Sequence, residues 1–103
     1  MSDKYIIKNV YFRLTFSDAK LLYPTISTFV FVGLNLSEED AEDTYYFQFI
    51  DSFTSSGSAA ESNPEGDFRV TSLVKDDLPE MLTLEELHLN LKACEDKRLT
   101  SAE

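Results

Sequence analysis

The chain has 103 residues, a mass of 11.7 kDa and a formal net charge of −10, from 9 Lys and Arg against 19 Asp and Glu. Hydrophobic residues make up 43% of it, which is too apolar for a disordered acidic tail and fits one small globular domain, residues 1–103. The acidity argues against direct binding to nucleic acid or to an anionic membrane surface, since both need clustered Lys and Arg.

The first two-thirds of the chain predicts strands. All thirteen aromatic residues lie between Tyr5 and Phe68, and aromatic and β-branched residues favour strands, whereas the Leu-rich last third favours helix. The strand pattern covers four ranges: 4–16, 25–36, 44–53 and 68–74. The first three are joined without room for a crossover helix, so antiparallel pairing is expected.

The connections between these ranges carry their own signals. Residues 17–23 predict a turn with Ser17 as the cap of one short helical turn, which Pro24 ends. Gly33, inside the second range, is expected to mark a bulge or a close contact. Residues 54–67 are small and polar, and they predict one long, flexible loop.

The last third of the chain predicts a short helical turn over 77–82 and then one helix. Thr83 and Glu86 have the spacing of a capping box, in which each side chain bonds the other residue's backbone amide. A stripe at helical spacing follows, made of Leu84, Leu87, Leu91 and Cys94. The tail, 100–103, is expected to fray. The predicted fold class is therefore α+β, with a four-stranded, mainly antiparallel sheet packed against a C-terminal α-helix (β-β-β-β-α).

The residue types and their spacing give little indication of a catalytic site or a metal site. The one histidine, His88, and the one cysteine, Cys94, are six positions apart on the predicted helix and point in different directions. Zinc needs three or four ligands of these types or carboxylates, and no phosphate-binding or hydrolase motif is present. We therefore expect no enzyme, no metal and no cofactor. A single cysteine and the absence of a signal peptide pattern predict a cytoplasmic protein.

The strongest functional signal is a run of acidic residues between the second and third strands. It lacks the Gly and the spacing of an EF-hand loop, so a solvated loop or a contact surface for a basic protein remain as interpretations. The expected contacts are Glu38, Glu39, Asp40, Glu42, Asp43, Tyr45 and Tyr46. The leading hypothesis is a small bacterial immunity-type or inhibitor protein that blocks a toxin or nucleic-acid-binding protein by electrostatic capture.

Two alternatives come from the geometry of the predicted sheet. One helix covers only one sheet face, and the second face is partly aromatic, with Tyr5, Tyr11, Phe29 and Phe31. A loop, a second copy, a partner or the curl of the sheet must cover it, so a homodimeric accessory or chaperone-like protein is the first alternative. A small enzyme or ligand carrier with a pocket under the helix is the second.

Overall fold

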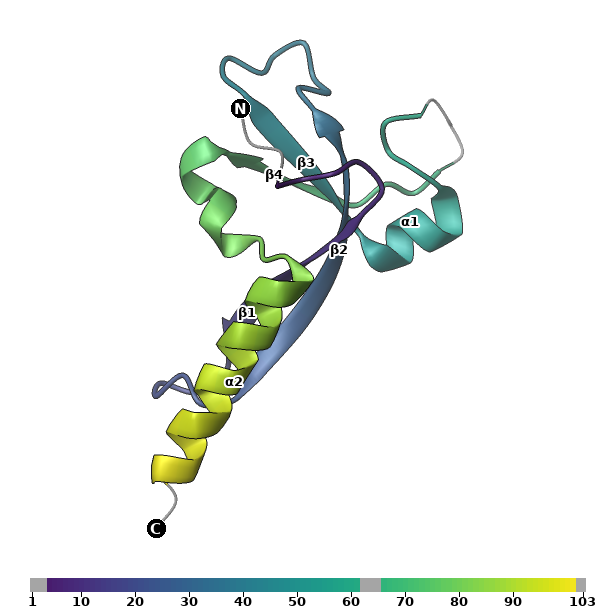
Figure 1. Cartoon of the computed structure of the whole chain (residues 1–103). Helices are drawn as coiled ribbons and strands as arrows, with labels where there is room; N and C mark the ends of the chain where they lie inside the picture. Colours follow the sequence, from purple (N-terminus) through teal and green to yellow (C-terminus); the bar gives the residue numbers. More distant parts are fainter. Residues whose placement is uncertain (1–3, 62–65, 102–103) are drawn as a thin grey trace.

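The computed structural model describes residues 4–61 and 66–101 (Figure 1). Four antiparallel strands lie in the order β1-β2-β3-β4, and the predicted α+β fold is confirmed. In chain order the elements are β1 (Val10–Phe16), β2 (Pro24–Leu34), β3 (Thr44–Phe49), α1 (Ile50–Ser56), β4 (Val70–Val74), the 3-10 helix η1 (Lys75–Glu80) and α2 (Leu84–Ser101).

The sheet is curled into a half-barrel, and the chain closes it after β4. Figure 1 shows the chain passing from β4 through η1 to α2, which runs beside β1. Just before α2, Leu82 forms an antiparallel bridge with Phe12 of β1. The first and last strands of the sheet are thus connected through η1, and the chain itself covers the aromatic core on the inner face.

The inner face of the half-barrel holds an aromatic core. Tyr11 pairs with Phe29, and Phe31 pairs with Phe47, so these four rings share one face of the sheet. The Tyr5 ring covers them, with its centroid 5.0 Å from that of Tyr11 and 5.5 Å from that of Phe47. Leu73, Leu78 and Met81 complete the buried cluster. The aromatic face is therefore covered by the chain's own N-terminal segment and η1, and by the curl of the sheet.

A bulge in β2 changes which side chains face the core. The register shifts by one residue between Phe31 and Gly33, which confirms the predicted bulge. Gly33 has a φ of +154°, which side chains rarely adopt, so the position favours glycine. Beyond the bulge, Leu34 pairs with Tyr45 and joins the inner face. Without the bulge, alternation along β2 would place Leu34 on the opposite face, with Val30.

All four predicted strand ranges extend past the observed strands. β2 ends at Leu34 rather than at residue 36, and β4 begins at Val70 rather than at residue 68. β1 begins at Val10 rather than at residue 4, because Lys8 adopts a left-handed φ of 73° and a turn joins Ile6 to Asn9. Residues 50–53 form the first part of α1 rather than the end of a strand, and α1 also occupies 54–56 of the predicted loop. Residues 62–65 of that loop lie outside the described residues, and its flexibility stays a prediction.

Buried polar bonds hold α1 against the outer face of the sheet. Gln48 of β3 is fully buried and donates from Nε2 to Ser52 Oγ at 3.0 Å and to the Gly57 carbonyl oxygen at 2.9 Å. The Gln48 Oε1 accepts from the Ala59 amide at 2.7 Å. Gln48 pairs with the buried Val30 on this face, so α1 covers it. These contacts between β3 and the following residues explain why the chain turns into a helix at Ile50.

The C-terminal helix α2 begins at the predicted capping box. The Thr83 amide donates to Glu86 Oε1 at 2.9 Å, and the Glu86 amide donates to Thr83 Oγ1 at 3.2 Å. Leu87 and Cys94 of the predicted stripe are buried, but Leu84 is 68% exposed. The helix continues through residues 100 and 101, which were expected to fray, while 102–103 lie outside the described part.

The turn before β2 is built by Asp18 rather than by Ser17. The Asp18 carboxylate accepts from the amides of Leu22 and Tyr23, both at 2.9 Å, and no helical turn forms. These two amides lower the pKa of the Asp18 carboxyl below its ordinary value. The turn docks on α2, since the Arg98 guanidinium donates to the Leu22 carbonyl oxygen. Of the helices in the described ranges, none combines the length and the apolar character that a membrane span requires.

Candidate functional site

The acidic hairpin, residues 35–43, is closed at its base by Asn35. This residue adopts a left-handed φ of 54°, which asparagine tolerates better than most residues. Its backbone amide donates to the Thr44 carbonyl oxygen, and its Oδ1 accepts from the Thr44 amide, both at 2.8 Å. Its Nδ2 donates to Asp43 Oδ1 at 3.1 Å. The two ends of the hairpin are thus held together by side-chain and backbone bonds.

A second anchor, Asp40, fixes the middle of the acidic hairpin. Its carboxylate accepts from the Tyr46 hydroxyl at 2.9 Å and from the Ser37 amide at 3.1 Å. Burial of the hydroxyl, followed by the charge of Asp40, raises the pKa of Tyr46 above its ordinary value. Asp40 therefore serves the conformation of the hairpin, and Tyr46 ties that hairpin to β3.

The remaining acids of the hairpin are exposed and uncompensated. These are Glu38, Glu39 and Glu42, and in the part of the chain that the structure describes their carboxylates have no hydrogen bond or ion pair. The seven predicted contact residues thus fall into different groups. Three glutamates present free charge, while Asp40, Asp43 and Tyr46 build the loop that carries them.

The seventh predicted residue, Tyr45, lies on the other face of the sheet. Neighbouring residues of a strand point to opposite faces, so Tyr45 and Tyr46 do not share one surface. The ring of Tyr45 packs 6.0 Å from those of Tyr5 and Phe31, in the core of the half-barrel. Tyr45 therefore belongs to the core side of β3, whereas Tyr46 contacts the acidic hairpin.

The partly exposed side of Tyr45 lines a pocket at the same end of the half-barrel as the hairpin. The pocket has a volume of about 810 Å³ and is open to solvent on one side. Its apolar lining comprises Tyr5, Leu34, Tyr45, Leu78 and Pro79, and its charged lining comprises Lys4, Asp43, Lys75 and Glu86. Sequence reasoning missed this pocket, because its residues come from five separate segments and no local pattern connects them.

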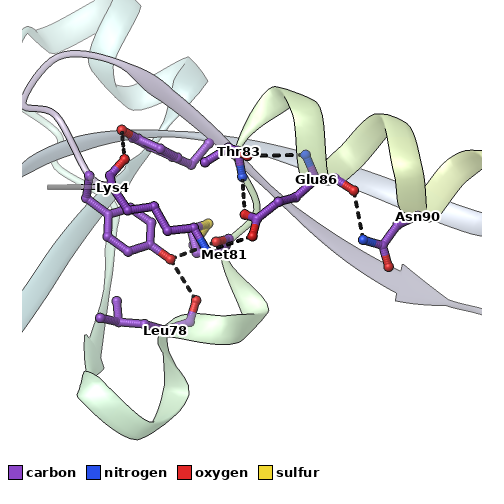
Figure 2. A network of polar contacts seen from close by, with 8 residues as sticks. Lys4, Leu78, Met81, Thr83, Glu86 and Asn90 are labelled. Atoms are coloured by element: carbon purple, nitrogen blue, oxygen red, sulfur yellow. Dashed lines mark hydrogen bonds and ion pairs between the residues drawn. The ribbon is translucent and has the colours of Figure 1, made fainter. Parts of the chain in front are cut away.

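Polar contacts hold one wall of the pocket in place. Figure 2 shows Glu86 between Lys4 and Thr83, with 2.8 Å between Lys4 Nζ and Glu86 Oε2. The hydrogen bond between them raises the pKa of Lys4 and, together with the Thr83 amide, lowers the pKa of Glu86. The Tyr5 hydroxyl lies 2.9 Å from the carbonyl oxygens of both Leu78 and Met81. Burial raises the pKa of this hydroxyl, so it stays a neutral donor.

The loop after α1, which carries Glu61 and Asp67, does not extend the hairpin surface. Figure 1 shows the 35–43 hairpin at the top of the view and the loop after α1 at the right, on a different side of the sheet. In the described part of that loop, Glu61 lies 3.8 Å from Lys8. The acidic surface is therefore centred on the hairpin, with Asp76 and Asp77 of η1 following Lys75 at the pocket.

Candidate catalytic groups do not converge. His88 is exposed and Cys94 is buried on α2, as expected from their spacing. Among residues 4–61 and 66–101, no group of three or more His, Cys, Asp or Glu side chains is placed to hold a metal ion. The geometry of this chain thus offers a charged hairpin and an adjoining pocket as its candidate functional features.

No family model, no curated protein and no solved structure matches this chain. Site residues of a known family therefore cannot be carried over to it. The functional proposal below depends on the chemistry of the hairpin and on its position beside the pocket.

Proposed function

We propose that this protein is a small, acidic, cytoplasmic binding protein of the immunity or inhibitor type, which is not an enzyme. It blocks a basic partner, such as a toxin or a nucleic-acid-binding protein, by electrostatic capture at the acidic hairpin. The observation that carries the proposal is the placement of Glu38, Glu39 and Glu42, which are exposed and uncompensated on a loop fixed by its own side chains.

The physical basis is electrostatic steering followed by docking on a preorganised loop. Uncompensated charges of one sign attract an oppositely charged partner over several ångströms and raise its rate of association. Asp40 and Asn35 hold the loop conformation before binding, so less conformational entropy is lost when the partner docks. Asp40, Asp43 and Tyr46 act as positioning residues in this mechanism, and the three glutamates make the contacts.

The test starts with the basic partner. Partners are cross-linked to the protein in extracts of its source cells at low salt, identified by mass spectrometry and purified. Association rates are then measured by stopped flow over a series of salt concentrations. We expect the rate to fall steeply with ionic strength, and the triple variant Glu38→Lys, Glu39→Lys, Glu42→Lys to slow association by about tenfold or more.

A matched control separates local charge from net charge. Glu85→Lys, Glu95→Lys and Asp96→Lys change the net charge by the same amount, but these residues lie on exposed positions of α2. Figure 1 shows α2 running from the middle of the molecule to the end opposite the hairpin. We expect the control to retain most of the association rate. Equal slowing in both variants, or a rate that does not depend on salt, would contradict the proposal.

A further inference from the structure

The pocket beside the hairpin has an apolar floor that the fold leaves open. Tyr5 and Leu78 form its buried base, each only 8% exposed. Leu34 is 43% exposed, although the bulge in β2 places it on the inner face with Tyr45. Because this apolar surface remains accessible, binding of an apolar side chain from another molecule there would be favourable, since it removes apolar area from water.

The pocket and the acidic hairpin form one continuous surface. Leu34 and Tyr45 pair with each other where β2 ends and β3 begins, so they flank the base of the hairpin. Asp43 belongs to the hairpin and also lines the pocket. Thr44 pairs with Val74, so the next register position places Asp43 opposite Lys75 at the rim. A partner that contacts the hairpin therefore also reaches the pocket.

The rim charges favour an occupant that is apolar at its centre and cationic on the side of the hairpin. Lys4 is neutralised by Glu86 at 2.8 Å, so this wall adds little net charge. On the hairpin side, Lys75 lies opposite Asp43, so the excess negative charge there comes from the uncompensated Glu38, Glu39 and Glu42 of the hairpin. An apolar pocket that can bury an anchor side chain is typical of energetic hot spots in protein interfaces.

We infer that the pocket receives an aromatic or aliphatic side chain of the same basic partner, flanked in that partner by Lys or Arg that pair with the hairpin. The inference rests on the proposed function. It adds the pocket to the hairpin as a second part of the surface that the basic partner contacts. An open pocket that adjoins a charged loop suits a side chain presented by a protein better than a small ligand, which is normally enclosed on most sides.

The test uses short peptides as probes and NMR chemical shifts as the readout. One peptide has a Phe between two pairs of lysines, the second has Ala in place of Phe, and the third has Phe between pairs of glutamates. We expect the Phe-lysine peptide to shift resonances of Leu34, Tyr45 and Leu78 and to bind about tenfold tighter than the Ala peptide. The Ala peptide should shift only hairpin resonances, and the Phe-glutamate peptide should bind weakly.

Two variants of equal size give a matched control. Leu34→Trp fills the pocket, and Ile26→Trp places the same ring on β2 at a residue that is 44% exposed and does not line the pocket. Circular dichroism checks that both fold. In Leu34→Trp the Phe-lysine and Ala peptides should bind with equal affinity. In Ile26→Trp the Phe-lysine peptide should still bind more tightly than the Ala peptide.

The outcomes separate this inference from the proposed function. If the Phe-lysine and Ala peptides bind equally and shift only the hairpin, the pocket inference is wrong and electrostatic capture stands. If the Phe-lysine peptide still binds the pocket with full affinity after the three hairpin glutamates are changed to Gln, the pocket inference is supported and the proposed electrostatic capture is wrong. Binding of phenethylammonium alone as tightly as the Phe-lysine peptide would overturn the inference in favour of a small-ligand site.

Discussion

Phe12 and Leu82 exchange two backbone hydrogen bonds, with the Phe12 amide 2.9 Å from the Leu82 carbonyl oxygen and the Leu82 amide 2.7 Å from that of Phe12. This bridge joins the segment after η1 to β1 and closes the curled sheet. It also places the start of α2, whose capping residue Thr83 follows directly. A defect at Leu82 should therefore weaken the whole half-barrel rather than one local turn.

Leu82→Pro tests this bridge. Proline has no amide hydrogen, so the bond to the Phe12 carbonyl oxygen is lost and half of the bridge is broken. We expect the free energy of unfolding in urea to fall by about 2–3 kcal/mol. Leu82→Ala keeps the amide and is the control for lost side-chain burial. If both variants unfold at the same urea concentration, the hydrogen bond does not contribute as argued.

Tyr5→Phe tests how the N-terminal segment is fixed over the core. The ring remains, but the buried hydroxyl can no longer donate to the carbonyl oxygens of Leu78 and Met81. The one hydrogen that the hydroxyl shares between these oxygens is lost, while the Leu78 carbonyl oxygen still accepts from the Met81 amide at 2.9 Å, and we expect a loss of about 1–2 kcal/mol in unfolding free energy. Tyr23→Phe is the control, since Tyr23 is 61% exposed, and it should be neutral. A neutral Tyr5→Phe would show that water replaces the hydroxyl at no cost.

The ion pair between Lys4 and Glu86 predicts a pH dependence of stability. The pKa of Glu86 lies below its ordinary value of 4.5, so its contribution is present above that pH and is lost as the pH falls through the folded-state pKa. The pKa of Lys4 lies above 10.5, so its contribution is present below that pH and is lost as the pH rises through the folded-state pKa. Both side chains are more than one-third exposed, which keeps the effect small.

Glu86→Gln checks the acid limb of this dependence. The amide cannot ionise, so chemical denaturation measured over a series of acidic buffers should show a shallower loss of stability than in the wild type. Glu85→Gln changes the neighbouring carboxylate, which is exposed at the same turn of α2, and should follow the wild-type curve. An unchanged acid slope in Glu86→Gln would mean that its bond to Lys4 does not persist in solution.

The parts of the fold that could be predicted depend on local patterns. Alternation identified the central strands, and the spacing of Thr83 and Glu86 identified the start of α2, because both signals lie within a few residues. The helix α1 could not be predicted in this way. Its position depends on Gln48, which is buried by tertiary contacts that the alternation of residues 44–53 does not show.

The candidate site was predictable in composition but not in arrangement. The run of acids is visible in the sequence, yet the difference between Asp40, which is bonded to Tyr46, and the free Glu38 and Glu39 depends on the loop conformation. The pocket is even harder to predict from the sequence. Its wall is held by Lys4 and Glu86, which are 82 positions apart.

Gln48→Leu tests the polar anchor of α1. Leucine keeps much of the volume, but the Gly57 carbonyl oxygen and the Ala59 amide lose their buried partner. Because unpaired buried groups are costly, we expect a loss of about 2–4 kcal/mol in unfolding free energy and faster hydrogen exchange at the Ala59 amide. Ser55→Ala, on the exposed side of α1, should be nearly neutral. Wild-type stability in Gln48→Leu would show that apolar packing alone fixes α1 on the sheet.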